Sequence, residues 1–198
     1  MITWGWTGMS HDASLAVFSD KGLEFAAHSE RYSRIKNDKN LNRSIIDEAL
    51  EFGKPNKIFF YEKPWLKKTR QLYAKQYTLL KKESPTTYIR NFIKDAPKCT
   101  TTSHHLGHSA YAYYTGPWHR ALILVVDSIG EWETGSIWKG KNGKLKKIWS
   151  QKYPDSVGIW YSAMTQRIGL KPQEHEYILM GMAAIGDPKK YYSEIKKD

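Results

Sequence analysis

The sequence predicts an α/β protein, because strand-forming runs alternate with segments of helical periodicity and because one arrangement of strands occurs twice. The first three-stranded meander has apolar runs at 2–6, 14–18 and 23–27, with a connecting turn at 19–22. The second meander has strand-forming runs at 121–126, 132–138 and 145–153, with a connecting turn at 141–144. The repetition indicates two copies of one structural unit.

Helices and two further strands separate the meanders. Ile45, Ile46 and Ala49 share one helix face, and Gly53 ends that helix. The next elements are expected as a strand at 57–61, helices at 65–82 and 86–94, a strand at 99–102 and a helix at 106–114. Two helices, at 159–168 and 177–184, are expected after the second meander. The order is therefore βββαβαβα followed by an incomplete second copy.

Two such units resemble the plan of the actin-like ATPases (the ASKHA superfamily, with ribonuclease H-like lobes), to which sugar kinases and Hsp70-like proteins belong. In that plan two lobes face each other across a nucleotide cleft. The resemblance implies one complete lobe over residues 1–118 and the start of a second, truncated lobe over 119–198. Because one fold hosts many activities, it does not assign a function.

The composition is that of a soluble globular protein. Eight Trp, thirteen Tyr and six Phe supply core material, and no run reaches the roughly 18 apolar residues that span a bilayer. The N-terminus lacks the order of a signal peptide, and Cys99 is the only cysteine, which excludes an intramolecular disulfide and a thiolate zinc cluster. We expect a cytoplasmic protein, with no membrane partner, that binds any metal through His and carboxylates.

The net charge of +11 is compatible with nucleic-acid binding. The lysines are scattered in pairs along the chain, however, at positions where solvated helix faces and hairpins usually carry charge. We therefore interpret the charge as a determinant of solubility and do not expect a nucleic-acid partner.

The segment from His104 to His108 is the sharpest chemical signal. If a helix begins here, His104 and His108 share one face and can chelate one metal ion. Asp127 follows five apolar strand residues, at the strand end where α/β sheets place ligands, and is the candidate third ligand. A polar, His-rich surface is the alternative interpretation.

Two segments rich in small residues are candidates for nucleotide or phosphate binding. Gly130 and Glu131 lie in a turn after Asp127, where backbone N–H groups can approach an anion and a carboxylate can hold its cation. Gly181 and Gly186 flank a second segment that allows close backbone approach. A plain hairpin turn and a capped helix end are the respective alternatives.

Candidate groups for acid-base chemistry and anion binding lie near the N-terminus. A histidine side chain can serve as an acid or a base, and Asp12 is placed to orient that of His11, so the pair is a candidate catalytic group. Arg31, Arg34 and Lys36 place three cations close together, as a phosphate or carbamoyl phosphate would need. A local Asx turn and a solvated loop are the alternatives.

Five motifs in this order resemble the nodulation-protein-U-like carbamoyltransferases, a family that includes antibiotic O-carbamoyltransferases. The motifs are HDAS at 11–14, SERYSRIK at 29–36, HHLGHSA at 104–110, VVDSIGE at 125–131 and YILMGMAAIG at 177–186. Gly107 departs from the usual Ala of the third motif. The resemblance spans nearly the whole chain but only the front portion of a typical family member.

The resemblance implies transfer of a carbamoyl group, activated from carbamoyl phosphate and ATP as a carbamoyl adenylate, to a hydroxyl of a small molecule. His104, His108 and Asp127 match three metal-ligand positions of the family, and iron is the first expectation, with zinc or manganese as alternatives. In the family a separate C-terminal domain forms the adenylate, which implies that a second polypeptide supplies it for this chain.

Two other functions fit the sequence. One is the related actin-like enzyme of tRNA threonylcarbamoylation, which shares the His-x-x-x-His pair and would use the basic charge to bind RNA. The other is a non-catalytic truncated or split subunit that binds metal or nucleotide and acts only with a partner.

Overall fold

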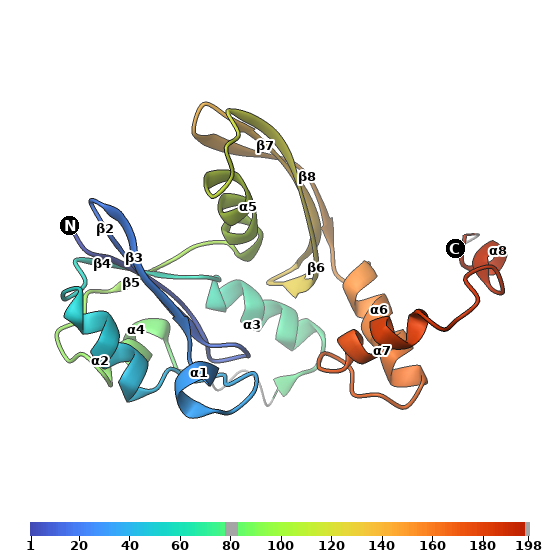
Figure 1. The fold of residues 1–198 in the computed structure, drawn as a ribbon, viewed down its shortest axis with the longest axis horizontal. Coiled ribbons are helices and arrows are strands. Elements are labelled where there is room, and N and C mark those ends of the chain that lie inside the picture. The colour runs from blue at the N-terminus through green and yellow to red at the C-terminus, as the bar shows by residue number, and fades with distance from the viewer. Residues whose placement is uncertain (78–82, 197–198) are drawn as a thin grey trace.

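The computed structural model describes residues 1–77 and 83–196 and contains two β-sheets connected by helices (Figure 1). The first sheet has the order β3-β2-β1-β4-β5. Its strands are β1 (Thr3–Thr7), β2 (Ser14–Ser19), β3 (Gly22–His28), β4 (Lys57–Phe60) and β5 (Cys99–Thr101). The meander β1 to β3 is antiparallel, whereas β4 and β5 are added parallel to β1. The carboxyl ends of β1, β4 and β5 therefore lie at one edge of the sheet.

The main core lies on one face of this sheet. Helix α2 (Arg43–Glu51) begins at Asn42, whose side chain accepts the Ile45 N–H, and packs against β2 and β3. Two short helices, α1 (Glu30–Ser33) and α4 (Pro85–Arg90), complete this part of the chain. Trp4 and Trp6 are fully buried in the core, and each large apolar side chain buried in this way contributes about 1.5–3 kcal/mol to stability.

The second sheet is antiparallel and has the order β6-β7-β8. Its strands are β6 (Arg120–Gly130), β7 (Glu133–Lys141) and β8 (Lys144–Lys152). Helix α5 (His104–Tyr114) lies against β6 and β7 and forms a small core with Ile123, Val125 and Trp138. On the opposite face of β6 Leu122 is 72% exposed and Leu124 65% exposed.

Helix α3 (Pro64–Tyr73) connects the two sheets. The indole N–H of Trp132 donates to the Thr69 hydroxyl at 3.0 Å, and the Tyr73 ring contacts the rings of Trp132 and Tyr153. Because Trp132 occupies the β6–β7 turn and Tyr153 follows β8, these contacts tie α3 to the second sheet.

The remaining helices follow the second sheet. They are α6 (Val157–Arg167), α7 (Glu176–Ala183) and α8 (Tyr192–Ile195). Helix α6 packs against β6, and α7 packs against α6. Among the described residues, none of the helices has the length and the apolar character needed to cross a membrane.

Both predicted meanders and the mixed α/β class are confirmed. The helix expected over 65–82 ends at Tyr73, and its final five predicted residues lie outside the described part of the chain. The helix expected from residue 106 begins at His104, and the strand expected to end at residue 126 continues to Gly130 through a register shift. The boundary at residue 118 stays a prediction, although α5, placed in the first unit by sequence, packs on the second sheet.

Candidate metal centre

The predicted metal ligands lie where the two sheets approach each other. His104 is the first residue of α5 and follows β5 at the carboxyl edge of the first sheet, while His108 lies one helical turn further on. Asp127 belongs to β6, within the irregular part between Val126 and Gly130 where its pairing with β7 is interrupted. The helix start and the strand irregularity together aim three ligand side chains at one point.

The distances fit one metal ion. Nε2 of His104 lies 2.9 Å from Nε2 of His108 and 2.9 Å from Oδ2 of Asp127. One ligand atom from each of the three residues falls within 4.8 Å of the others. Within the described residues, the buried Asp127 Oδ2 also has no well-formed hydrogen bond. Two imidazole nitrogens and a carboxylate oxygen in this arrangement suit iron, zinc or manganese.

The protonation states at the site favour metal binding. Burial lowers the pKa of His108, the neighbouring His104 lowers it further, and Asp127 opposes both. Burial raises the pKa of Asp127, but its contact with His104, the Ser128 N–H and the His108 charge outweigh burial and hold the pKa below its usual value. A neutral imidazole and an ionised carboxylate are the forms that coordinate a cation.

A buried hydrogen-bond chain lies behind the ligands. Ser136 Oγ accepts the Trp138 indole N–H at 2.8 Å and lies 2.7 Å from Nδ1 of the fully buried His105. A Ser136 hydroxyl that donates to Nδ1 leaves the proton of a neutral His105 on Nε2. That nitrogen lies 3.9 Å from Asp127 Oδ2. These contacts hold the His105 ring beside the carboxylate.

Helix α6 supports Asp127 from the other side. Ser156, the N-cap residue of α6, donates its hydroxyl to the carbonyl oxygens of Asp127 and Ser128 at 3.3 and 2.7 Å and accepts the Ile159 N–H. A Cβ added at Gly158 would lie 2.6 Å from Ser128 Cα, so only glycine permits this approach of helix and strand.

Gly130 and Glu131 also lie at the metal centre. A Cβ at Gly130 would lie 2.3 Å from Cδ2 of His104, so Gly130 makes room for that imidazole. The buried Glu131 carboxylate accepts the Lys63 N–H at 2.6 Å, and the backbone N–H of His104 also stabilises its negative charge. Burial raises the pKa of Glu131, and these two N–H groups and the charge of His104 oppose the rise. The expected contact of the pair with a cofactor stays a prediction.

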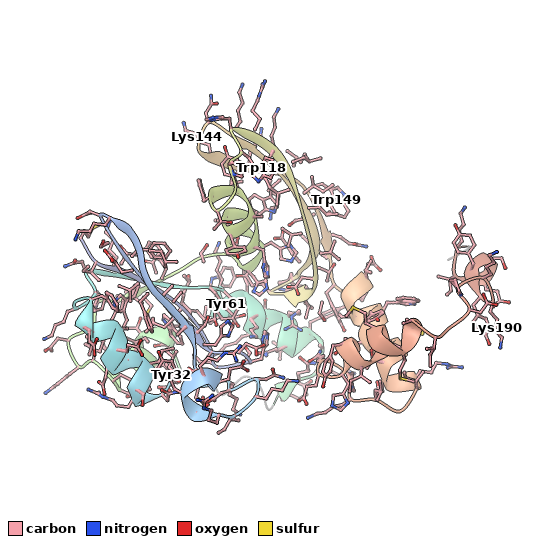
Figure 2. The ribbon with its side chains drawn as sticks, in the orientation of Figure 1. Tyr32, Tyr61, Trp118, Lys144, Trp149 and Lys190 are labelled. Atoms are coloured by element: carbon pink, nitrogen blue, oxygen red, sulfur yellow. The ribbon has the colours of Figure 1, made fainter. Side chains whose placement is uncertain are left out.

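A second polar cluster connects the metal centre to the turn after β1. The Tyr61 ring meets the His104 ring edge-on, with centroids 5.4 Å apart, and the Tyr61 hydroxyl lies 3.1 Å from the Ser10 hydroxyl. Lys67 Nζ donates to Ser10 at 2.8 Å and to both carboxylate oxygens of the buried Glu62. Tyr61 lies between the two sheets near the middle of the molecule (Figure 2).

The candidate catalytic pair follows Ser10 directly. His11 Nδ1–H donates to Asp12 Oδ2 at 2.9 Å, and both side chains are exposed to solvent. Asp12 has a φ of 45°, and its carbonyl accepts the Thr7 hydroxyl, so the turn has a defined local structure. The hydrogen bond leaves His11 Nε2 free to accept a proton. The structure brings the pair next to the Ser10 and Tyr61 cluster.

The three predicted anion-binding cations lie around the end of α1. Arg31 Nη2 is 3.6 Å from Glu30 Oε1, Arg34 has the left-handed φ of 59°, and Lys36 Nζ lies 4.5 Å above the Tyr177 ring centre. This last contact joins the α1 loop to α7, the helix that contains Gly181. Gly181 and Gly186 are exposed, and their expected contact with a nucleotide stays a prediction.

Local sequence patterns do not reveal the roles of His105, Ser136, Tyr61 or the paired Glu62 and Lys67. His105 lies between the two candidate histidine ligands, and Tyr61 and Glu62 belong to the sequence YEKP, but neither pattern indicates the contact of His105 with Ser136 or that of Tyr61 with Ser10. Only the tertiary arrangement brings Ser136 under His105.

Comparison with known proteins identifies the family of the chain. Residues 63–197 match the family model described as carbamoyltransferase N-terminus, which is more than half of the chain. The chain belongs to the carbamoyltransferase N-terminal family. The matched segment includes all three candidate metal ligands.

Relatives of this carbamoyltransferase N-terminal domain are considerably longer. It is 30% identical to the uncharacterized protein sll1178 of Synechocystis over 90% of the chain and 34% of that protein. It is 25% identical to nodulation protein NolNO of Sinorhizobium fredii, again over 90% of the chain and 28% of that protein. The chain thus spans about a third of the length of these relatives.

Among solved structures, two Ppx/GppA proteins of Aquifex aeolicus match 89% of the chain and 58% and 59% of their own chains. Their TM-scores are 0.38 and 0.40, with sequence identities of 14% and 12%. Similarity of that size does not establish a shared fold.

Proposed function

We propose that this domain holds the transfer site of an O-carbamoyltransferase and binds one divalent cation through His104, His108 and Asp127. The convergence of their ligand atoms within 4.8 Å is the observation that carries the proposal. A cation bound there would supply Lewis-acid polarisation of a carbonyl or phosphoryl oxygen. Iron is the proposed ion, with zinc and manganese as alternatives of suitable ligand preference.

The acceptor in this proposal is a hydroxyl of a small molecule, and His11 removes its proton. Asp12 accepts the Nδ1–H of His11, so the neutral ring presents Nε2 as the base. The negative charge of Asp12 also stabilises the imidazolium that forms. This arrangement supports the role of His11 as general base and that of Asp12 as its orienting group.

ATP and carbamoyl phosphate are the proposed source of the carbamoyl group. Arg31, Arg34 and Lys36 supply positive charge for a phosphate, and Gly181 and Gly186 leave backbone accessible near the same loop. A carbamoyl-activating domain is proposed to act together with this one. The exposed apolar residues of β6 offer that domain a surface, and a cytoplasmic location suits both substrates. The actin-like plan of two facing lobes is part of this proposal.

A second candidate function is tRNA binding of the threonylcarbamoylation type. The strand register places Lys139 opposite Lys146 and Lys141 opposite both Lys144 and Arg120, which gathers five cations at one end of the second sheet. Lys144 marks this end in Figure 2. Filter binding of tRNA at physiological salt tests this candidate, since carbamoyl transfer to a small molecule requires no RNA affinity.

Elemental analysis of the purified chain tests the metal site directly. We expect one equivalent of metal in the native chain and almost none after the double substitution His104→Ala and His108→Ala. His119→Ala, at a histidine outside the cluster, is the matched control and should retain metal. Equal metal contents in the native and double-substituted chains would exclude this site.

A further inference from the structure

Glu131 occupies an unusual position for a charged hairpin residue. Its backbone has a φ of 53°, which side-chain-bearing residues rarely adopt, and its side chain is only 5% exposed. A hairpin turn by itself favours Gly or Asn at such a position. The contacts of the buried carboxylate must therefore explain why a Glu occupies this position.

The carboxylate lies against the first residues of two helices. The N-cap residues of α3 and α5 are Lys63 and Ser103, and neither helix has a side-chain cap from its own N-cap residue. Glu131 accepts the N–H of Lys63 at 2.6 Å, and the backbone N–H of His104 also stabilises its negative charge. One anion thus lies at the starts of both helices, where the helix dipoles also favour negative charge.

These interactions connect three segments of the metal centre. Lys63 follows β4 of the first sheet, His104 is itself a candidate ligand, and Glu131 lies four residues after Asp127, directly after the end of β6. The adjacent Gly130 contacts the His104 ring, so the same turn restrains both the backbone and the imidazole of that ligand.

We infer that Glu131 is a positioning residue for the metal centre, holding His104 and Asp127 at chelating distance by capping α3 and α5 together. The inference rests on the proposed metal site and goes beyond it, because Glu131 contributes no ligand atom. Its effect reaches the metal only through the placement of His104 relative to the β6–β7 turn.

Cobalt(II) binding to the full chain tests the inference, because the visible absorption of the ion reports its coordination geometry. We expect Glu131→Ala to weaken Co²⁺ binding by about 10- to 100-fold, as loss of a residue that orients a ligand typically does, and to change the spectrum. Glu131→Gln keeps one acceptor oxygen but replaces the other by an N–H₂ group, so an intermediate loss is expected. The Glu131→Gln variant provides the test if Glu131→Ala does not fold.

Glu133→Gln is the matched control. Glu133 lies on the same hairpin, is also buried and pairs with Lys147 of β8, so its loss perturbs the hairpin without touching either helix start. This control should retain native Co²⁺ affinity and spectrum. If Glu131→Gln and the control bind Co²⁺ equally well, with the native spectrum, Glu131 is only a structural cap and the inference is wrong.

Amide hydrogen exchange in the metal-free chain separates this result from failure of the proposed function. We expect faster exchange at Lys63 and His104 in Glu131→Gln than in the native chain, whether or not metal binds. Native Co²⁺ binding with unchanged exchange in the variant would overturn the inference alone. A native chain that binds no Co²⁺ would overturn both the metal site and the positioning role.

Discussion

Nδ1 of His105 lies 2.7 Å from the hydroxyl oxygen of Ser136, in a fully buried contact between α5 and the middle strand of the second sheet. The two residues are 31 positions apart, and the contact holds the His105 ring in place next to His104. His105 is therefore a structural neighbour of the candidate ligand group, which consists of His104, His108 and Asp127.

Replacing Ser136 by Ala should destabilise the chain. The substitution leaves His105 Nδ1 and the Trp138 indole N–H buried without their partner, which costs about 1–3 kcal/mol for each unsatisfied group. Urea denaturation followed by tryptophan fluorescence measures the loss. Ser150→Ala, at the register partner of Ser136 on β8, should change stability by less than 0.5 kcal/mol, roughly the effect of a surface substitution. Equal losses in the two variants would contradict the role of the contact.

Acid should destabilise the metal-free chain from about pH 6.5 downward. Burial lowers the pKa of His105 below its usual value of about 6.5, so the unfolded chain binds a proton that the folded chain does not. Stability is therefore complete above pH 6.5 and falls as the pH decreases, with a limiting slope of about 1.4 kcal/mol per pH unit from this residue. Denaturation curves at several pH values measure the slope, and His105→Gln should make it shallower. An unchanged slope in that variant would assign the effect to other groups.

Gly130→Ala should abolish stoichiometric metal binding. The added Cβ would lie 2.3 Å from the His104 ring, so the imidazole or the turn must move. Gly107→Ala is the matched control, because an added Cβ there meets nothing within 4 Å and Ala favours the helix by about 0.5–1 kcal/mol. Elemental analysis of both variants should show metal only in the Gly107 variant. Normal metal content in Gly130→Ala would show that His104 can shift without leaving the site.

His11→Ala should reduce turnover and leave metal content unchanged. The His11 side chain pairs with Asp12 and is remote in sequence from the three ligands, so its proposed role is proton removal from the acceptor. Loss of a general base typically lowers the rate by about 10²- to 10⁴-fold. The measurement requires this domain together with the carbamoyl-activating part of the enzyme and an acceptor alcohol. A parallel loss of metal and turnover would instead assign His11 to the metal site.

Much of the fold follows from local sequence patterns. The strands of both meanders are short, rich in β-branched and aromatic residues and bounded by turn residues, so period and turn chemistry locate them without tertiary information. The ends of elements were harder to predict. β6 continues past Asp127 because its irregular part still pairs with β7 at Gly130 and Glu133, a contact between strands that no local pattern records.

The convergence of His104, His108 and Asp127 could also be predicted from the sequence, since the two histidines share a helix face by spacing and Asp127 ends an apolar run. The groups that surround them could not. The sequence predicts that Glu131 holds the cation of a phosphate, yet its carboxylate accepts the N–H of Lys63 and lies against the start of α5, both distant from it in sequence. Such contacts depend on where each helix begins, and the first residue of a helix can be predicted from sequence only to within a few residues.

Because α5 packs on the second sheet, the proposed metal ligands and the proposed base belong to different parts of the fold. His104, His108 and Asp127 all belong to the body formed by α5 and the second sheet, whereas His11, Ser10 and Tyr61 belong to the first sheet and its loops. The distances between the proposed ligands are therefore set within one body. The distance from the proposed base to these ligands depends instead on the contacts that join the two bodies, such as that of the Trp132 indole with the Thr69 hydroxyl.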